Sequence, residues 1–165
     1  MRARSMLSVT TAFVGVLMIA AVLLVATAAA AGGDHTVTMT ENFHGSNVST
    51  GSNPCNGDTV DLSQISNSVF HETFFPAGDE AWGTFTEEDK VVGIDEGTGV
   101  VYTGHSTFWG NFNMNNQNSN TTSTGSIHVT GSDGSSLSFH EVSHMTLRPD
   151  GTISVSFDKP SVTCG

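Results

Sequence analysis

The sequence predicts an all-β domain arranged as an antiparallel meander, and two observations support this. Thr, Val, Phe and Ile alternate with polar residues after residue 31, and no segment there keeps the 3.6-residue apolar period of a helix. Short clusters of Gly, Asn, Asp and Ser separate the alternating segments, and short links between successive strands require antiparallel pairing. We expect strands at 35–43, 59–75, 81–94, 99–114, 125–130, 136–147 and 152–157.

Turn chemistry supports these boundaries. Asn53-Pro54-Cys55-Asn56-Gly57, Ser132-Asp133-Gly134 and Pro149-Asp150-Gly151 each combine residues that favour tight turns. The Asn- and Ser-rich segment 113–123 has Met114 as its one apolar residue, which predicts a mobile surface loop.

The segment 100–114 favours a closed barrel. Apolar side chains dominate one of its faces, and Gly104 and Gly110 on that face are placed where a strand curls. An up-and-down barrel of the lipocalin-like type removes the exposed sheet edges of a small protein. A two-sheet sandwich gives the same strand pattern and remains the alternative.

The N-terminus has the pattern of a secretory signal peptide. Arg2 and Arg4 precede an apolar run from Met6 to about Val25, and Ala29-Ala30-Ala31 offers a small-residue cleavage site. The run is long enough for an uncleaved membrane anchor, but no basic stop-transfer cluster follows it. We therefore expect a signal peptide at 1–31, an arm with one strand at 32–52 and a single domain at 53–165, secreted from the cell.

The mature chain is acidic, with 16 Asp and Glu against three remaining Lys and Arg. Nucleic acid and anionic membranes need clustered basic residues, so the composition argues against both as partners. The oligomeric state is not indicated.

Cys55 and Cys164 are the two cysteines, and an exported chain most often pairs two such residues in a disulfide. A metal site and two free thiols are the alternatives. The absence of a C-x-x-C spacing argues against zinc.

His140-Glu141-Val142-Ser143-His144 spells the H-E-x-x-H signature of zinc metalloproteases, whose chemistry requires a helix. Here Leu137, Phe139, Met145 and Leu147 alternate at period two, which predicts a strand. On a strand the two histidines lie about 13 Å apart, too far to bind one zinc ion. We interpret the motif as a strand sequence and expect no catalytic residue, metal or cofactor.

Three residues are candidates for ligand binding. Glu72 lies between Phe70 and Phe74, Glu141 follows Phe139, and Tyr102 shares the apolar face of its strand. If the Phe face is the interior, one or both carboxylates are buried and their pKa rises. A bulge that turns both glutamates to water is the alternative. Five histidines fall opposite the apolar positions of their strands: His71, His105, His128, His140 and His144. We expect their side chains to face water, and a transition-metal site is the alternative.

Five ordered segments resemble a group of small secreted actinobacterial β-rich proteins: Asn53–Asp58, Tyr102–His105, Gly131–Ser135, Phe139–His144 and Phe157–Pro160, with Cys164 after them. The resemblance implies a signal peptide, a β-rich domain, paired cysteines and no assigned activity.

These observations favour a secreted, non-enzymatic β-domain that binds a small molecule or a cell-envelope component. A small barrel-cavity enzyme, isomerase-like or hydrolytic, using Glu72, Glu141 and Tyr102 is one alternative. A structural surface protein is the other.

Overall fold

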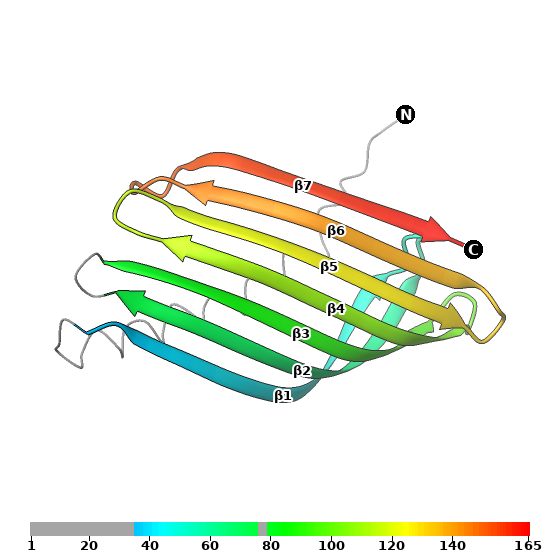
Figure 1. The fold of residues 1–165 in the computed structure, drawn as a ribbon. Helices are drawn as coiled ribbons and strands as arrows, with labels where there is room; N and C mark the ends of the chain where they lie inside the picture. The colour runs from blue at the N-terminus through cyan, green and yellow to red at the C-terminus, as the bar shows by residue number, and fades with distance from the viewer. Residues whose placement is uncertain (1–34, 76–78) are drawn as a thin grey trace.

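The computed structural model describes residues 35–75 and 79–165, which form seven strands in one sheet (Figure 1). The predicted signal peptide at 1–31 lies outside these residues. Each strand pairs antiparallel with the next one along the chain, so the sheet order is the sequence order. The strands are β1 (Val37–Ser52), β2 (Thr59–Phe75), β3 (Glu80–Asp95), β4 (Val101–Met114), β5 (Ser119–Gly131), β6 (Ser136–Leu147) and β7 (Ile153–Cys164).

The predicted all-β antiparallel meander is confirmed, whereas the expected barrel closure is not present. The hydrogen-bonded ladder ends at β1 and β7, which do not pair with each other in the described residues. One sheet accounts for all seven strands, so no second sheet forms a sandwich there. The described segments also contain no helix that could cross a membrane.

Three predicted strands were too short, because polar segments at their ends were interpreted as loops. β1 continues to Ser52, and β5 begins at Ser119, so the loop expected at 113–123 is confined to 115–118. β7 continues through Pro160 to Cys164. A proline is tolerated there because β7 is an edge strand, and Ser, Thr and Asn in β5 are held by pairing on both sides.

The sheet has an inner face, defined by the side chains that share the side of Phe70, Val91 and Val129, and an opposite outer face. Burial alternates between them; in β3 the inner positions include Ala81 and Val91, which are buried, while Val92 on the outer face is 42% exposed. The buried apolar residues are few in the described chain: Val60, Phe70, Ala81, Val91 and Val129. The inner face is therefore only thinly packed with apolar side chains.

Inner-face glycines allow aromatic rings to lie against the backbone. A Cβ on Gly83 would lie 2.5 Å from the Phe112 ring, and one on Gly110 would lie 2.3 Å from the Phe85 ring. Gly125 is covered in the same way by Phe108 at 3.1 Å. Small residues on one face of several neighbouring strands let the sheet curl toward that face.

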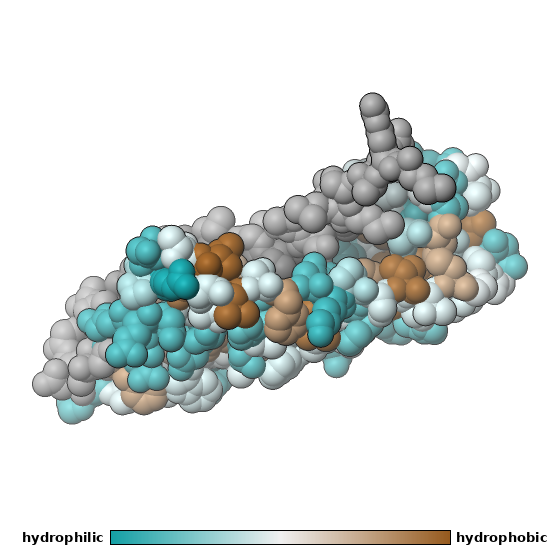
Figure 2. Space-filling view, turned by 90° about the horizontal axis from the view of Figure 1, so that it is seen from above, coloured by the Kyte–Doolittle hydropathy of each residue, from teal (hydrophilic) through white to brown (hydrophobic). Residues whose placement is uncertain are grey.

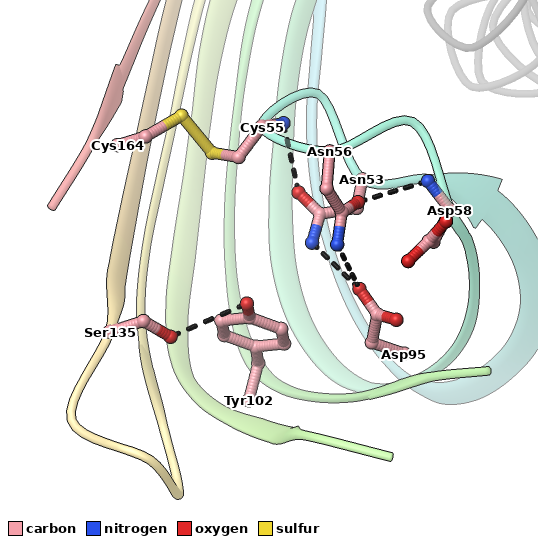
Figure 3. Close-up of a disulfide and its surroundings, with 8 residues drawn as sticks. All are labelled: Asn53, Cys55, Asn56, Asp58, Asp95, Tyr102, Ser135 and Cys164. Atoms are coloured by element: carbon pink, nitrogen blue, oxygen red, sulfur yellow. Dashed lines mark hydrogen bonds between the residues drawn. A yellow bond between two sulfur atoms is a disulfide. The ribbon is translucent and has the colours of Figure 1, made fainter. Parts of the chain in front are cut away.

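The sheet curls strongly at the end where Cys55 and Cys164 form a disulfide (Figure 3). Cys55 lies in the β1–β2 turn and Cys164 ends β7, so on a flat sheet five strand spacings, about 24 Å, would separate them. Their Cα atoms are 5.9 Å apart. In Figure 1 the corresponding ends of β1 and β2 bend out of the plane of the other strands. The predicted cysteine pairing is thus present.

Asp95 organises the turns beside this disulfide and is completely buried. Its Oδ2 accepts hydrogen bonds from Asn53 Nδ2 (2.9 Å) and Asn56 Nδ2 (3.0 Å), and its Oδ1 accepts from the backbone N–H groups of Gly97 (3.1 Å) and Thr98 (2.9 Å). These donors hold the pKa of Asp95 well below its usual range. The β1–β2 and β3–β4 turns are therefore joined through one carboxylate. We call the disulfide and these hydrogen bonds the clamp.

Removing the disulfide should destabilise the domain substantially. The loop-entropy relation for a bridge that spans 109 residues predicts a loss of about 5 kcal/mol in the free energy of unfolding for the Cys55→Ser, Cys164→Ser double variant. Chemical denaturation monitored by circular dichroism measures this loss. An unchanged unfolding midpoint would show that the bridge does not hold the curled end together.

Replacing Asp95 should lower the Tm because Asp95→Asn removes the charge that four donors surround. Glu96→Gln is the matched control, since Glu96 is the next residue and is exposed. Thermal unfolding at pH 7 should show a clear loss for Asp95→Asn and almost none for Glu96→Gln. Equal Tm values for the two variants would contradict the role given to Asp95.

Candidate functional site

Besides Asp95 of the clamp, six carboxyl side chains lie on the inner face, as the strand register shows. They are Glu41, Glu72, Glu87, Asp89, Glu141 and Asp158. In the described segments the three Lys and Arg residues lie elsewhere: Lys90 and Lys159 occupy outer positions, and Arg148 belongs to the β6–β7 turn. The inner face is therefore anionic without compensating basic side chains.

Glu72 is the most deeply buried of these carboxyls, with 1% of its surface exposed. Neither of its carboxyl oxygens has a hydrogen-bond partner. Its register neighbours are Met39 and Gly83, and the ring of Phe112 lies over Gly83. Burial raises the pKa of Glu72, and the charge of Glu41 raises it further.

Glu87 and Asp89 form a second pair on β3. Asp89 accepts a hydrogen bond from Ser106 Oγ through Oδ2, while its buried Oδ1 has no partner. Burial raises the pKa of Glu87, and the charge of Asp89 and a hydrogen bond with it act in the same direction. The position of Glu87 beside Asp89 therefore disfavours the ionised form of Glu87.

Glu141 and Asp158 form the third pair, across β6 and β7. Glu141 is 9% exposed, and burial, followed by the charge of Asp158 and a hydrogen bond with it, raises the pKa of Glu141 to about 7. The structure thus places both Glu72 and Glu141 on the inner face and out of water, rather than turned outward by a bulge.

Tyr102 lies far from both glutamates. It occupies the inner face of β4 at the clamp end, where Ser135 Oγ donates a hydrogen bond to its Oη at 3.4 Å (Figure 3). Ten residues of β4, about 33 Å, separate Tyr102 from Phe112 beside Glu72. Glu72 on β2 and Glu141 on β6 have three strands between them. The three predicted residues therefore do not meet in one constellation.

The H-E-x-x-H segment is part of β6, which confirms the strand interpretation. His140 and His144 lie on the outer face and Glu141 on the inner face, so the three side chains do not converge.

The outer-face histidines mostly contact polar partners on the adjacent strand. In four of them the ring atom Nδ1 lies within hydrogen-bond distance of a hydroxyl oxygen. The pairs are His71 with Thr40 Oγ1 (2.8 Å), His128 with Ser138 Oγ (2.7 Å), His140 with Ser126 Oγ (2.8 Å) and His144 with Thr122 Oγ1 (2.8 Å). Residues 35–75 and 79–165 contain no group of three or more His, Cys, Asp or Glu placed to hold a metal ion.

A polar hollow of about 340 Å³ also lies near the middle of β1–β3. Most of its lining belongs to the outer face, and the lining residues are Asn42, His44, Asn67, Ser68, Val69, Thr86 and Glu88. It contains none of the predicted site residues.

The sequence reasoning missed four of the six inner-face carboxyls. The signal was present for three of them, because alternation along 81–94 places Glu87 and Asp89 on the face of Phe85 and Val91, and Glu41 lies between Met39 and Phe43 in another alternating segment. Asp158 was hidden because the apolar side chains of Val155 and Phe157 in the same strand lie on the outer face.

No family model, curated protein or solved structure matches this chain. The resemblance to secreted actinobacterial proteins therefore stays a prediction.

The raised pKa of Glu141 should make the free energy of unfolding increase as the pH falls from about 7 toward 4.5. Between pH 4.5 and about 7 the folded state holds a proton on Glu141 that the unfolded state has released, so the folded state is favoured at the acidic end of this window. Allowing for solvent screening, we expect about 1 kcal/mol, or about 4 °C in Tm, between pH 7.5 and pH 5.

Glu141→Gln should remove that part of the pH dependence, and Glu88→Gln, an exposed outer-face change, should not. Thermal unfolding of the two variants at both pH values measures the difference. Identical pH dependence in the two variants would contradict burial of Glu141.

Proposed function

We propose that the protein is a secreted binding protein that holds a small molecule, or a small group of a cell-envelope component, against the inner face of its curled sheet. The observation that carries this proposal is Glu72, a buried carboxyl without a hydrogen-bond partner. Buried polar groups are normally satisfied, because leaving one unpaired costs free energy. Such a group is retained where a ligand supplies the partner.

The surroundings of Glu72 fit a ligand with an apolar part. The rings of Phe70 and Phe112 stack with centroids 6.0 Å apart, and those of Phe85 and Phe108 with centroids 5.3 Å apart. Few apolar residues are fully buried in the described strands, which speaks against a domain that serves only as a packed structural unit. The separation of Glu72, Glu141 and Tyr102 gives no support to an enzyme that uses all three together.

Secretion is supported by the disulfide, which is compatible with an oxidising, extracellular environment. The signal-like pattern at 1–31 supports the same compartment. We therefore expect the mature protein to start near Gly32. N-terminal sequencing of the protein purified from culture medium tests this.

A neutral apolar dye should bind the inner face. Titration of purified protein with N-phenyl-1-naphthylamine should give a saturable rise in dye fluorescence. Ser143→Phe places a bulky ring on the inner face of β6 and should weaken dye binding at least 5-fold.

Val142→Phe is the matched control, because it adds the same ring at the next residue, on the outer face. Circular dichroism should show that both variants keep the β-sheet. Absence of saturable binding, or equal weakening by both variants, would reject the inner face as the binding surface.

A further inference from the structure

We infer that the ligand of the inner face is an organic cation with an apolar body, such as an alkyl- or arylammonium compound. This inference rests on the proposed function and adds the chemical class of the ligand. It follows from the purely acidic charge of the inner face and from the surroundings of Glu72.

In the described strands the inner face carries carboxyl charges alone, whereas the outer face carries both signs. Lys90, Lys159 and the strand histidines lie on the outer face, together with the carboxyls of Asp61 and Glu88. A neutral ligand needs no such arrangement, and an anionic ligand is repelled by it. Clustered charges of one sign attract and select ligands of the other sign.

Glu72 provides the second, independent observation. Its two oxygens lack partners and it is 1% exposed, so the inner face holds a buried acceptor group that a cationic donor can satisfy. Glu41 is close enough to add its charge, since the two carboxyls interact electrostatically.

The neighbouring side chains favour an organic cation over a metal ion. Calcium takes six to eight oxygen ligands, but no three His, Cys, Asp or Glu side chains converge in residues 35–75 and 79–165. Around Glu72 lie Met39, Phe70 and the Phe112 ring over Gly83. Aromatic faces attract ammonium groups through cation–π interactions, and apolar side chains accommodate a hydrocarbon body.

The test compares ligands that share a ten-carbon chain and differ in head-group charge. Isothermal titration calorimetry at pH 7.5, below micelle-forming concentrations, measures binding of decylammonium, decanol and decanoate to the purified protein. We expect decylammonium to bind at least 10-fold more tightly than decanol, and decanoate to bind most weakly. Glu72→Gln should reduce the preference for the cation over decanol at least 5-fold.

Glu88→Gln is the control, because it removes the same charge from the outer-face hollow and should leave the preference unchanged. Equal affinity for decylammonium and decanol would overturn the inference while leaving the proposed function in place. No binding of any of the three compounds, together with no dye binding, would reject both. A cation preference that survives Glu72→Gln, or that Glu88→Gln abolishes, would overturn the assignment to the inner face.

Discussion

The bridge between Cys55 and Cys164 is the constraint on which the rest of the structure depends. It holds the β1–β2 turn and the end of β7 with Cα atoms 5.9 Å apart, although these segments belong to opposite sides of a seven-stranded sheet. Asp95 extends this constraint to the β3–β4 turn. Because one end of the sheet is drawn together, the side chains of one face are gathered and partly dehydrated.

The curvature and the anionic inner face oppose each other energetically. Neighbouring carboxyls such as Glu87 and Asp89 repel when ionised, and their burial adds a desolvation cost. A sequence selected for stability alone would place apolar residues at these positions. The clamp holds this sheet curled at one end, and a rigid scaffold of this kind commonly accompanies an energetically unfavourable site.

The fold class was predictable from sequence, because period-two alternation and Asx–Gly turns are local signals. The turns at Gly134 and Gly151 have the positive φ that their sequences require. The same signals could not show whether the sheet closes into a barrel, because pairing of the first strand with the last depends on the curvature of all seven strands together. The burial of Glu72 was an open alternative because alternation gives a face and not the depth of burial. The closeness of Glu41 to Glu72 was not predictable, because it depends on the register between β1 and β2.

The order of the strands has a consequence for how the chain folds. All extensive contacts in the described residues join strands that are consecutive in sequence, so each strand is held only by its sequence neighbours. Arrays of nearest-neighbour units tend to unravel from their ends. β7, whose twelve residues are all exposed, is such an end, and Figure 2 shows hydrophobic and hydrophilic residues interspersed along that side. A covalent link from the last strand to the first hairpin converts a row of units into a ring-like topology, in which neither terminal unit can detach without strain on the other. Cooperativity in this protein is thus supplied by a long-range covalent bond rather than by a large shared core.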